Sequence, residues 1–382
     1  MIPLAIPNLC GNEARYLQEC VSTGFVSSVG SFVGRFEALV AQSAGTPGAV
    51  ATSAGTTGLH LALVTVGVQP GELVIIPSYT FIATANAVSH AGAIPWLFDV
   101  SPDDWCLDPA LLQDTLARET ERRFGGLFHI ASGRRVAALM PVFALGLIPE
   151  FSPYRLIASE YGLPLVADAA PAVGARRDDK GVGAFADLTV FSFNGNKTVT
   201  SGGGGAIVSA DKTLLARAKH LSSTARSGED YTHDQVGFNY RMTNVEAAVG
   251  CAQMENLAMF IAAKRRIRDS YRSVLQGFTQ ISFSPEAPDR GNACWFSGFV
   301  FCENGREQFA KLNTLLNAAG VQCRPFWKPV HLQAPYAHAP RTPMPVCGAL
   351  WERVVVLPSS TQLTAEEQNT VIKEVSSFLH SA

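Results

Sequence analysis

Apolar residues between positions 49 and 210 recur as short runs, and helical patterns lie between several of them. The runs are rich in aliphatic and aromatic residues, which is typical of strands buried on both faces. Strands of this kind that alternate with helices, such as the pattern at 80–90, predict an α/β fold with a mostly parallel sheet. The predicted strands cover 74–76, 93–100, 136–143, 163–167, 188–193 and 206–209.

The pattern changes after residue 245. A long helical pattern over 245–275 carries the basic run Lys264-Arg-Arg266, which we expect to lie on a solvated helix face. Two strand-like runs and one helical pattern follow, at 296–302, 354–357 and 306–319.

The length of 382 residues exceeds the size at which one hydrophobic core usually stops growing. We therefore predict two domains, a large one over 1–250 and a smaller α/β domain over 251–382. The polar, arginine-rich stretch 116–135 is predicted to be a surface insertion.

The composition restricts the partners. Hydrophobic residues make up 47% of the chain and charged residues 16%, as in an ordered protein with a large core. The formal charge is −2 and no basic tract stands out, which argues against a nucleic-acid partner. The longest uncharged apolar run, 136–149, is too short to span a bilayer, and the first residues lack the features of a signal peptide. We expect no membrane partner.

The eight cysteines are scattered, and none forms a Cys-x-x-Cys pair or a cluster of the zinc type. We therefore predict no metal site. Reduced thiols in the cytoplasm are the simplest interpretation.

Lys197 follows the apolar run at 188–193 and precedes four glycines, Gly202 to Gly205. Glycines permit a close approach of backbone, so the amine is able to bend back over the end of the strand toward a ligand. A buried lysine readily loses its proton and forms a Schiff base with an aldehyde. A flexible surface turn with a solvated lysine is the alternative.

Asp168 follows the apolar run at 163–167, so it is predicted to lie at the carboxyl end of a buried strand. A buried carboxylate needs a cation or a strong donor. It would suit a protonated pyridine nitrogen, as the electron sink of pyridoxal phosphate requires. The alternative is an aspartate that caps the following turn.

Gly55-Thr56-Thr57 opens a helical pattern, and the free N–H groups of a helix start favour an anion such as phosphate. The threonines could equally cap the helix. Ser192 lies on the strand that leads to Lys197 and could reach the same phosphate.

Phe81 begins a second helix after a strand, where its ring could stack on a flat cofactor or belong to the core. His60, inside an apolar helix pattern, is interpreted as a packed histidine. The order of helix start, aromatic ring, aspartate and lysine along the chain suits pyridoxal phosphate.

These residues belong to motifs that run nearly end to end: Gly11-Asn-Glu13, Thr23-Gly-Phe-Val-Ser-Ser-Val-Gly30, Gly55-Thr-Thr57, Thr80-Phe-Ile-Ala-Thr-Ala-Asn86, Asp168-Ala-Ala170, Ser192-Phe-Asn-Gly-Asn-Lys197, Gly237-Phe-Asn-Tyr-Arg-Met242 and Arg324-Pro-Phe-Trp-Lys-Pro-Val-His331. With these motifs the chain resembles the DegT-type sugar-nucleotide aminotransferases, a fold type I pyridoxal phosphate family. The resemblance implies a large domain with a seven-stranded type of sheet.

The resemblance also implies roles. Lys197 would hold the cofactor covalently and move protons, and Asp168 would keep the ring nitrogen protonated. Phe81 would stack on the ring. The remaining cofactor-binding residues would be Gly55, Thr56, Thr57, Ser192 and Asn194, with Asn239 reaching the phosphate from the neighbouring subunit of a homodimer. His331 and Arg241 would bind the substrate.

Shorter sequence motifs, such as Asn194-Gly-Asn-Lys197 and Leu357-Pro-Ser-Ser360, resemble those of the branch that aminates UDP-linked sugars on the way to legionaminic acid or bacillosamine. That branch moves the amino group of L-glutamate to C4 of a 4-keto-6-deoxy-N-acetylhexosamine for cell-surface glycans, through a pyridoxamine phosphate intermediate. GDP-perosamine synthases share the first motif and form the alternative. A non-catalytic regulator on the same fold is a second alternative. A related dehydratase is disfavoured, because those enzymes carry histidine in place of Lys197.

Three residues depart from the family pattern. Pro171 stands where a polar side chain is usual, Phe143 where histidine is common, and Ala167 where glutamate is frequent. Proline offers neither a side-chain donor nor an N–H group. These departures concern the preference for substrate more than the use of cofactor.

Overall fold

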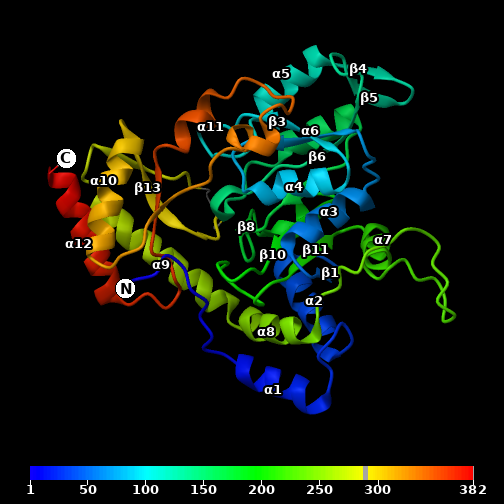
Figure 1. Cartoon of the computed structure of the whole chain (residues 1–382), viewed down its shortest axis with the longest axis horizontal. Coiled ribbons are helices and arrows are strands. Elements are labelled where there is room, and N and C mark those ends of the chain that lie inside the picture. The colour runs from blue at the N-terminus through cyan, green and yellow to red at the C-terminus, as the bar shows by residue number, and fades with distance from the viewer. Residues whose placement is uncertain (287–290, 382) are drawn as a thin grey trace.

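A computed structural model of the chain describes residues 1–286 and 291–381. Its central feature is a large mixed sheet in the first two thirds of the chain (Figure 1). The strands in this part are β1 (Gly48–Thr52), β2 (Leu73–Pro77), β3 (Ile94–Phe98), β4 (Thr120–Arg123), β5 (Gly126–His129), β6 (Arg135–Leu139), β7 (Val166–Asp168), β8 (Arg176–Arg177), β9 (Lys180–Gly181), β10 (Leu188–Ser192) and β11 (Gly205–Ser209).

Seven of these strands lie side by side in the order β1-β11-β10-β7-β6-β2-β3, since parallel bridges at Leu139–Leu165 and Val142–Asp168 place β7 beside β6. All neighbours pair in parallel except β11, which is antiparallel to both β1 and β10. The mostly parallel sheet predicted from the sequence is confirmed, as are the six predicted strands. β1 was not predicted.

Helices cover both faces of this sheet. Along β2, Leu73 and Ile75 belong to one hydrophobic core, whereas Val74 and Ile76 belong to the other. Residues of α2, α5, α6 and α8 complete the first core, and residues of α3, α4 and α7 complete the second. The helices are α1 (Glu13–Thr23), α2 (Ser31–Ala44), α3 (Gly55–Thr65), α4 (Ile82–His90), α5 (Pro109–Glu119), α6 (Ser152–Tyr161), α7 (Lys212–Ser222) and α8 (Asn244–Glu255).

A second, antiparallel sheet of order β12-β13-β15-β14 lies in the C-terminal part, where α9, α10 and α12 pack around a separate core (Figure 1). The first residues of the chain join this part, because Ile2 pairs with Val321 and Ser359 N donates to Leu4 O at 2.8 Å. The elements are α9 (Leu257–Leu275), β12 (Ile281–Phe283), β13 (Ser297–Phe301), α10 (Gly305–Ala318), β14 (Arg324–Pro325), α11 (Pro345–Leu350), β15 (Val354–Leu357) and α12 (Ala365–Ser381). The boundary at 250/251 stays a prediction.

Two expectations need correction. The helical pattern over 245–275 forms two helices that separate at Asn256. The basic run in α9 is solvated only in part, since Arg266 is exposed but Lys264 is 2% exposed. The Lys264 ammonium is buried because backbone carbonyls accept its hydrogen bonds.

The predicted insertion at 116–135 contains the end of α5 and the β4–β5 hairpin, which lies at the edge of the molecule (Figure 1). His60 is buried as expected, and its Nδ1 lies 3.0 Å from the Tyr240 hydroxyl. No helix in the described part of the chain combines the length and the apolar character needed to cross a membrane.

Candidate active site

A cavity of about 460 Å³ lies where the ends of several elements of the large sheet meet residues of the C-terminal part. Asp168 ends β7, Ser192 ends β10, and Gly55 begins α3, so strand ends and a helix start meet in one place. Ligands of open α/β sheets bind beyond the carboxyl ends of strands. The opposite wall comes from residues 295–296 and 324–327.

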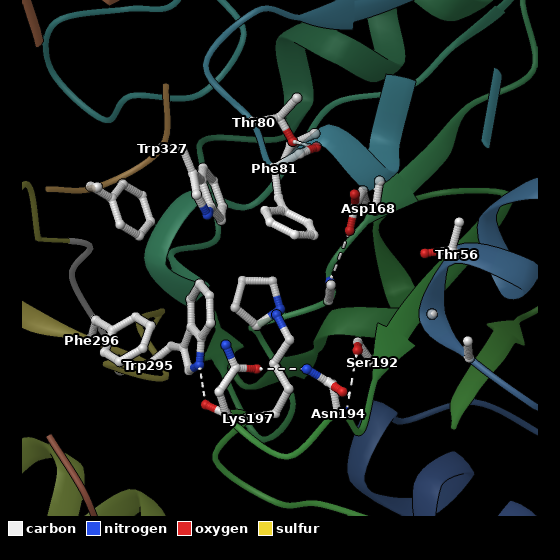
Figure 2. A pocket seen from close by; sticks show the side chains of 18 of the residues that line it. Thr56, Thr80, Phe81, Asp168, Ser192, Asn194, Lys197, Trp295, Phe296 and Trp327 are labelled. Carbon is white, nitrogen blue, oxygen red and sulfur yellow. Dashed lines mark hydrogen bonds between the residues drawn. The ribbon is translucent and has the colours of Figure 1, made fainter. Parts of the chain in front are cut away.

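Lys197 enters this cavity from the loop after β10 (Figure 2). Burial lowers the pKa of its amine to about 8, while the Asp168 carboxylate opposes that shift. A measurable fraction of the amine is therefore unprotonated near neutral pH, as a nucleophile or a base requires. The Trp295 ring lies beside the amine, with its centroid 3.9 Å from Nζ.

Asp168 is 4% exposed, and each carboxylate oxygen accepts a hydrogen bond. Thr84 Oγ1 donates to Oδ2 at 2.7 Å, and Ala170 N donates to Oδ1 at 3.1 Å. Burial raises the pKa of Asp168, and the two donors and the Lys197 charge lower it. The carboxylate thus stands ready to pair with a cationic ligand group.

The start of α3 packs closely against the end of β10. A Cβ on Gly55 would lie 2.8 Å from Ser192 Cβ, so only glycine permits this approach. Thr56 and Ser192 line the cavity beside free N–H groups of the helix start, which suits a phosphate. Thr57 is not among the lining residues, because its hydroxyl accepts from Ala54 N at 3.0 Å and caps the helix instead.

Phe81 precedes α4, lines the cavity and is 57% exposed, an unusual environment for a core residue. Its ring lies in the cavity between Asp168 and Trp327 in Figure 2. Asn194 also lines the cavity, and its Nδ2 donates to Asn196 Oδ1 at 3.2 Å.

Three further predicted site residues, besides Thr57, lie outside this cavity. Asn239 is exposed on the segment that follows α7. The Arg241 Nε is buried without a hydrogen-bond partner among the described residues. The His331 Nδ1 lies 2.8 Å from the Ser78 hydroxyl. Other residues of the same motif line the cavity instead, namely Arg324, Pro325, Phe326 and Trp327.

Sequence reasoning missed two residues of the site. Thr84 lies three positions after Phe81 on the first turn of α4, so the helical spacing of the Thr80–Asn86 motif could have placed it near Asp168. Trp295 carried no local signal, because it reaches Lys197 across 98 positions of sequence (295 − 197).

The donor set fits pyridoxal phosphate. An amine, a carboxylate, an aromatic ring and a helix start with hydroxyl groups line one cavity, as an aldehyde, a basic nitrogen, a flat ring and a phosphate would require. Figure 2 shows Thr56 and Ser192 on the side of the cavity opposite Trp295 and Trp327, with Phe81 and Asp168 between them.

Known proteins are similar to this chain over most or nearly all of its length. A GDP-perosamine synthase of Caulobacter vibrioides is 36% identical, over 99% of this chain and 98% of its own. A UDP-N-acetyl-3-dehydro-alpha-D-glucosamine 3-aminotransferase of Acidithiobacillus ferrooxidans is 32% identical, over 90% of this chain and 88% of its own.

Among solved structures, DesV of S. venezuelae in complex with a ketimine intermediate superimposes with a TM-score of 0.85 at 28% identity, over 96% of this chain and 94% of that chain. The sequence model of the DegT/DnrJ/EryC1/StrS aminotransferase family matches residues 7–376. The chain therefore belongs to the DegT/DnrJ/EryC1/StrS aminotransferase family and is a pyridoxal phosphate-dependent sugar aminotransferase.

Proposed function

We propose that this protein moves the amino group of L-glutamate to C4 of a nucleotide-linked 4-keto-6-deoxy sugar, in the synthesis of cell-surface glycans. The observation that carries the proposal is the cavity that Lys197 and Asp168 share. The position C4 is supported by the similarity to a GDP-perosamine synthase over 99% of the chain.

Two nucleotide sugars are candidates. The motif at 357–360 favours a UDP-linked N-acetylhexosamine, whereas the motif at 194–197 is common to both alternatives. The 36% identity to a GDP-perosamine synthase favours a GDP-linked sugar. Both substrates present a ketone at the same ring position, so the chemistry at Lys197 is the same for both.

Each residue of the cavity would have a distinct role. Pyridoxal phosphate, when bound, supplies an electron sink for the carbon that loses its proton. Asp168 would keep the ring nitrogen positively charged, and Phe81 would support the ring face. Thr56, Ser192 and the N–H groups at the start of α3 would hold the phosphate. Lys197 would attach the cofactor and then carry the proton between the reacting carbons, a role that its pKa of about 8 suits.

The aromatic wall of the cavity would exclude water from the reacting amine. Trp295, Phe296, Phe326 and Trp327 line the side away from the helix start. Trp295 is buried against Phe326 and Trp327, with ring centroids 6.3 and 6.0 Å away. A dry wall strengthens the interaction between Asp168 and a cationic ring.

The full site would also need a second subunit. We propose a homodimer in which Asn239 of one protomer reaches the phosphate of its partner, because Asn239 is exposed and lies outside the cavity of its own protomer.

The absorbance spectrum of the purified chain tests the proposal. A visible band that bleaches with L-glutamate and returns with 2-oxoglutarate is expected, and Lys197→Ala should lack the band and lose turnover by at least roughly 10²-fold. Incubation of the enzyme, L-glutamate and either a UDP- or a GDP-linked 4-keto sugar, followed by mass spectrometry, identifies the substrate. A chain without the band, or without a response to any amino donor, would be a binding protein instead.

A further inference from the structure

Trp295 is held from several directions at once. The residue is 3% exposed, and its three polar groups all have partners. Its backbone N donates to Leu145 O at 3.1 Å, and its indole Nε1 donates to Asn196 O at 2.7 Å. Its backbone O accepts from Lys264 Nζ at 2.9 Å. The position of the indole ring is therefore strongly restrained.

The restrained ring faces the Lys197 amine, with 3.9 Å between Nζ and the ring centroid. A tryptophan ring at this distance attracts an ammonium group, most strongly where water is excluded. The indole N–H is bonded to Asn196, which immediately precedes Lys197. One residue of the C-terminal part thus contacts both the side chain of Lys197 and the backbone that carries it.

Lys264 supplies the anchor behind Trp295. It lies in the middle of α9 and is 2% exposed, and burial lowers the pKa of its amine to about 7. Besides Trp295 O, its Nζ donates to Ser359 O. The Ser359 hydroxyl in turn accepts from Ser297 N at 3.1 Å. The buried Lys264 amine thus joins α9 to Trp295, just before β13, and to Ser359, just after β15.

We propose that Trp295 is a positioning residue for Lys197, that its ring holds the amine toward the cavity, and that Lys264 fixes Trp295 in that place. This inference rests on the proposed role of Lys197 in binding pyridoxal phosphate. If Trp295 served only to fill the core, its ring would need no contact with the Lys197 amine, and its indole N–H would need no bond to Asn196.

The direction in which the pKa of Lys197 should change depends on the groups around its amine. Asp168 from β7 and Arg324 from β14 are the other ionisable side chains that line the cavity within the described residues, and both remain when Trp295 is replaced. Leucine in place of Trp295 keeps the wall apolar but lacks the ring that favours the ammonium form, so the replacement should lower the pKa of Lys197. Capture of pyridoxal phosphate reports this pKa, since only the unprotonated amine adds to the aldehyde carbon, with release of water.

The test follows the capture of pyridoxal phosphate by the full-length chain after removal of its cofactor. Stopped-flow absorbance gives the rate at a series of pH values around the Lys197 pKa of about 8. In Trp295→Leu the midpoint of the rate profile should fall by roughly half to one pH unit, and the plateau rate should fall as well. Lys264→Met keeps the ring and should move the midpoint in the same direction by less.

Trp351→Leu is the matched control, because Trp351 also has a lysine amine beside its ring, Lys328 at 5.9 Å, but lies outside the cavity. Its midpoint should equal that of the wild type. Should Trp295→Leu fail to fold, Trp295→Phe keeps an aromatic face without the N–H donor and should give an intermediate midpoint. An unmoved midpoint in the Trp295 and Lys264 variants overturns the inference even if the plateau rate falls. A wild-type chain that captures no pyridoxal phosphate overturns the proposed function as well.

Discussion

At the scale of single residues, the site depends on two buried groups of opposite charge type. Burial lowers the pKa of Lys197 to about 8 and raises the pKa of Asp168, whereas their mutual attraction opposes both shifts. Donors from Thr84 and Ala170 lower the pKa of Asp168, against the effect of burial. Burial thus makes the Lys197 amine more reactive, and the same burial makes the Thr84 and Ala170 donors necessary to stabilise the Asp168 carboxylate.

Thr84→Val should therefore impair the enzyme without changing the shape of the core. Loss of the Oγ1 donor raises the pKa of Asp168, so the acidic limb of the kcat/KM profile should move to higher pH. Because a hydrogen bond to a charged group is lost, kcat/KM at neutral pH should fall roughly tenfold or more. The pH–rate profile measures both effects. Thr84→Ser keeps the donor and should resemble the wild type, and an unmoved acidic limb in Thr84→Val would contradict the assignment.

The position of a site residue could be predicted from the sequence where the local hydrophobic pattern defines the strand or helix that carries it. Asp168 and Lys197 follow strongly apolar strands, so their meeting at one edge of a parallel sheet could be predicted. Trp295 could not, because its contact with Lys197 depends on how the C-terminal part packs against the large sheet. The hydroxyl of Thr57 caps α3. The sequence allowed either helix capping or phosphate binding, and the spacing of the motif does not distinguish between them.

At the scale of elements, the start of α3 is set by its contact with β10. Gly55 lies so close to Ser192 that even one methyl group would clash, and this contact brings the free N–H groups of α3 to the cavity. On the other side, a Cβ on Gly205 would lie 2.5 Å from Ala54 O. Glycines on both sides of the helix start thus permit close backbone packing around the start of α3.

Gly55→Ala should push α3 away from β10 and weaken the binding of pyridoxal phosphate by roughly tenfold or more, as overpacking of a tight contact does. An absorbance titration gives the Kd. Gly34→Ala is the matched control, because Gly34 lies in α2 with no atom near its Cβ position. That variant should bind the cofactor normally and gain up to about 1 kcal/mol of stability. Equal affinity in both variants would argue against this packing role.

The pattern of elements was predicted better than their ends. β1 is composed of small residues, Gly48–Thr52, and its apolar character is too weak to separate it from a loop. α8 and α9 read as one helix, because the amphipathic pattern continues across Asn256 although the chain turns there. The burial of Lys264 follows from carbonyl groups contributed by distant segments, which no pattern along α9 contains.

At the scale of the whole molecule, the proposed dimer explains residues that one protomer leaves unused. Asn239 lies outside the cavity. Phe25, Val26 and Val29, in the loop before α2, are large apolar residues that remain exposed. Exposed apolar groups of this kind are typical of protein interfaces.

Mixing two defective variants tests whether Asn239 acts across subunits. Lys197→Ala and Asn239→Ala should each have low activity alone. When they are unfolded and refolded together, half of the dimers are hybrids with one intact site, so activity should recover to about a quarter of the wild-type value. If Asn239 served its own protomer, mixing would give no more than the average of the two variants.

The walls of the cavity are drawn from nearly the whole chain, from Leu4 near one end to Val356 near the other. During synthesis, Lys197 and Asp168 leave the ribosome long before Trp295 and the 324–327 wall exist. A nascent chain that has folded its large sheet therefore displays the amine on an open surface. Enclosure of pyridoxal phosphate in this cavity would therefore have to wait until β15 is translated, and a chain that terminates early would keep its lysine but lack the 324–327 wall.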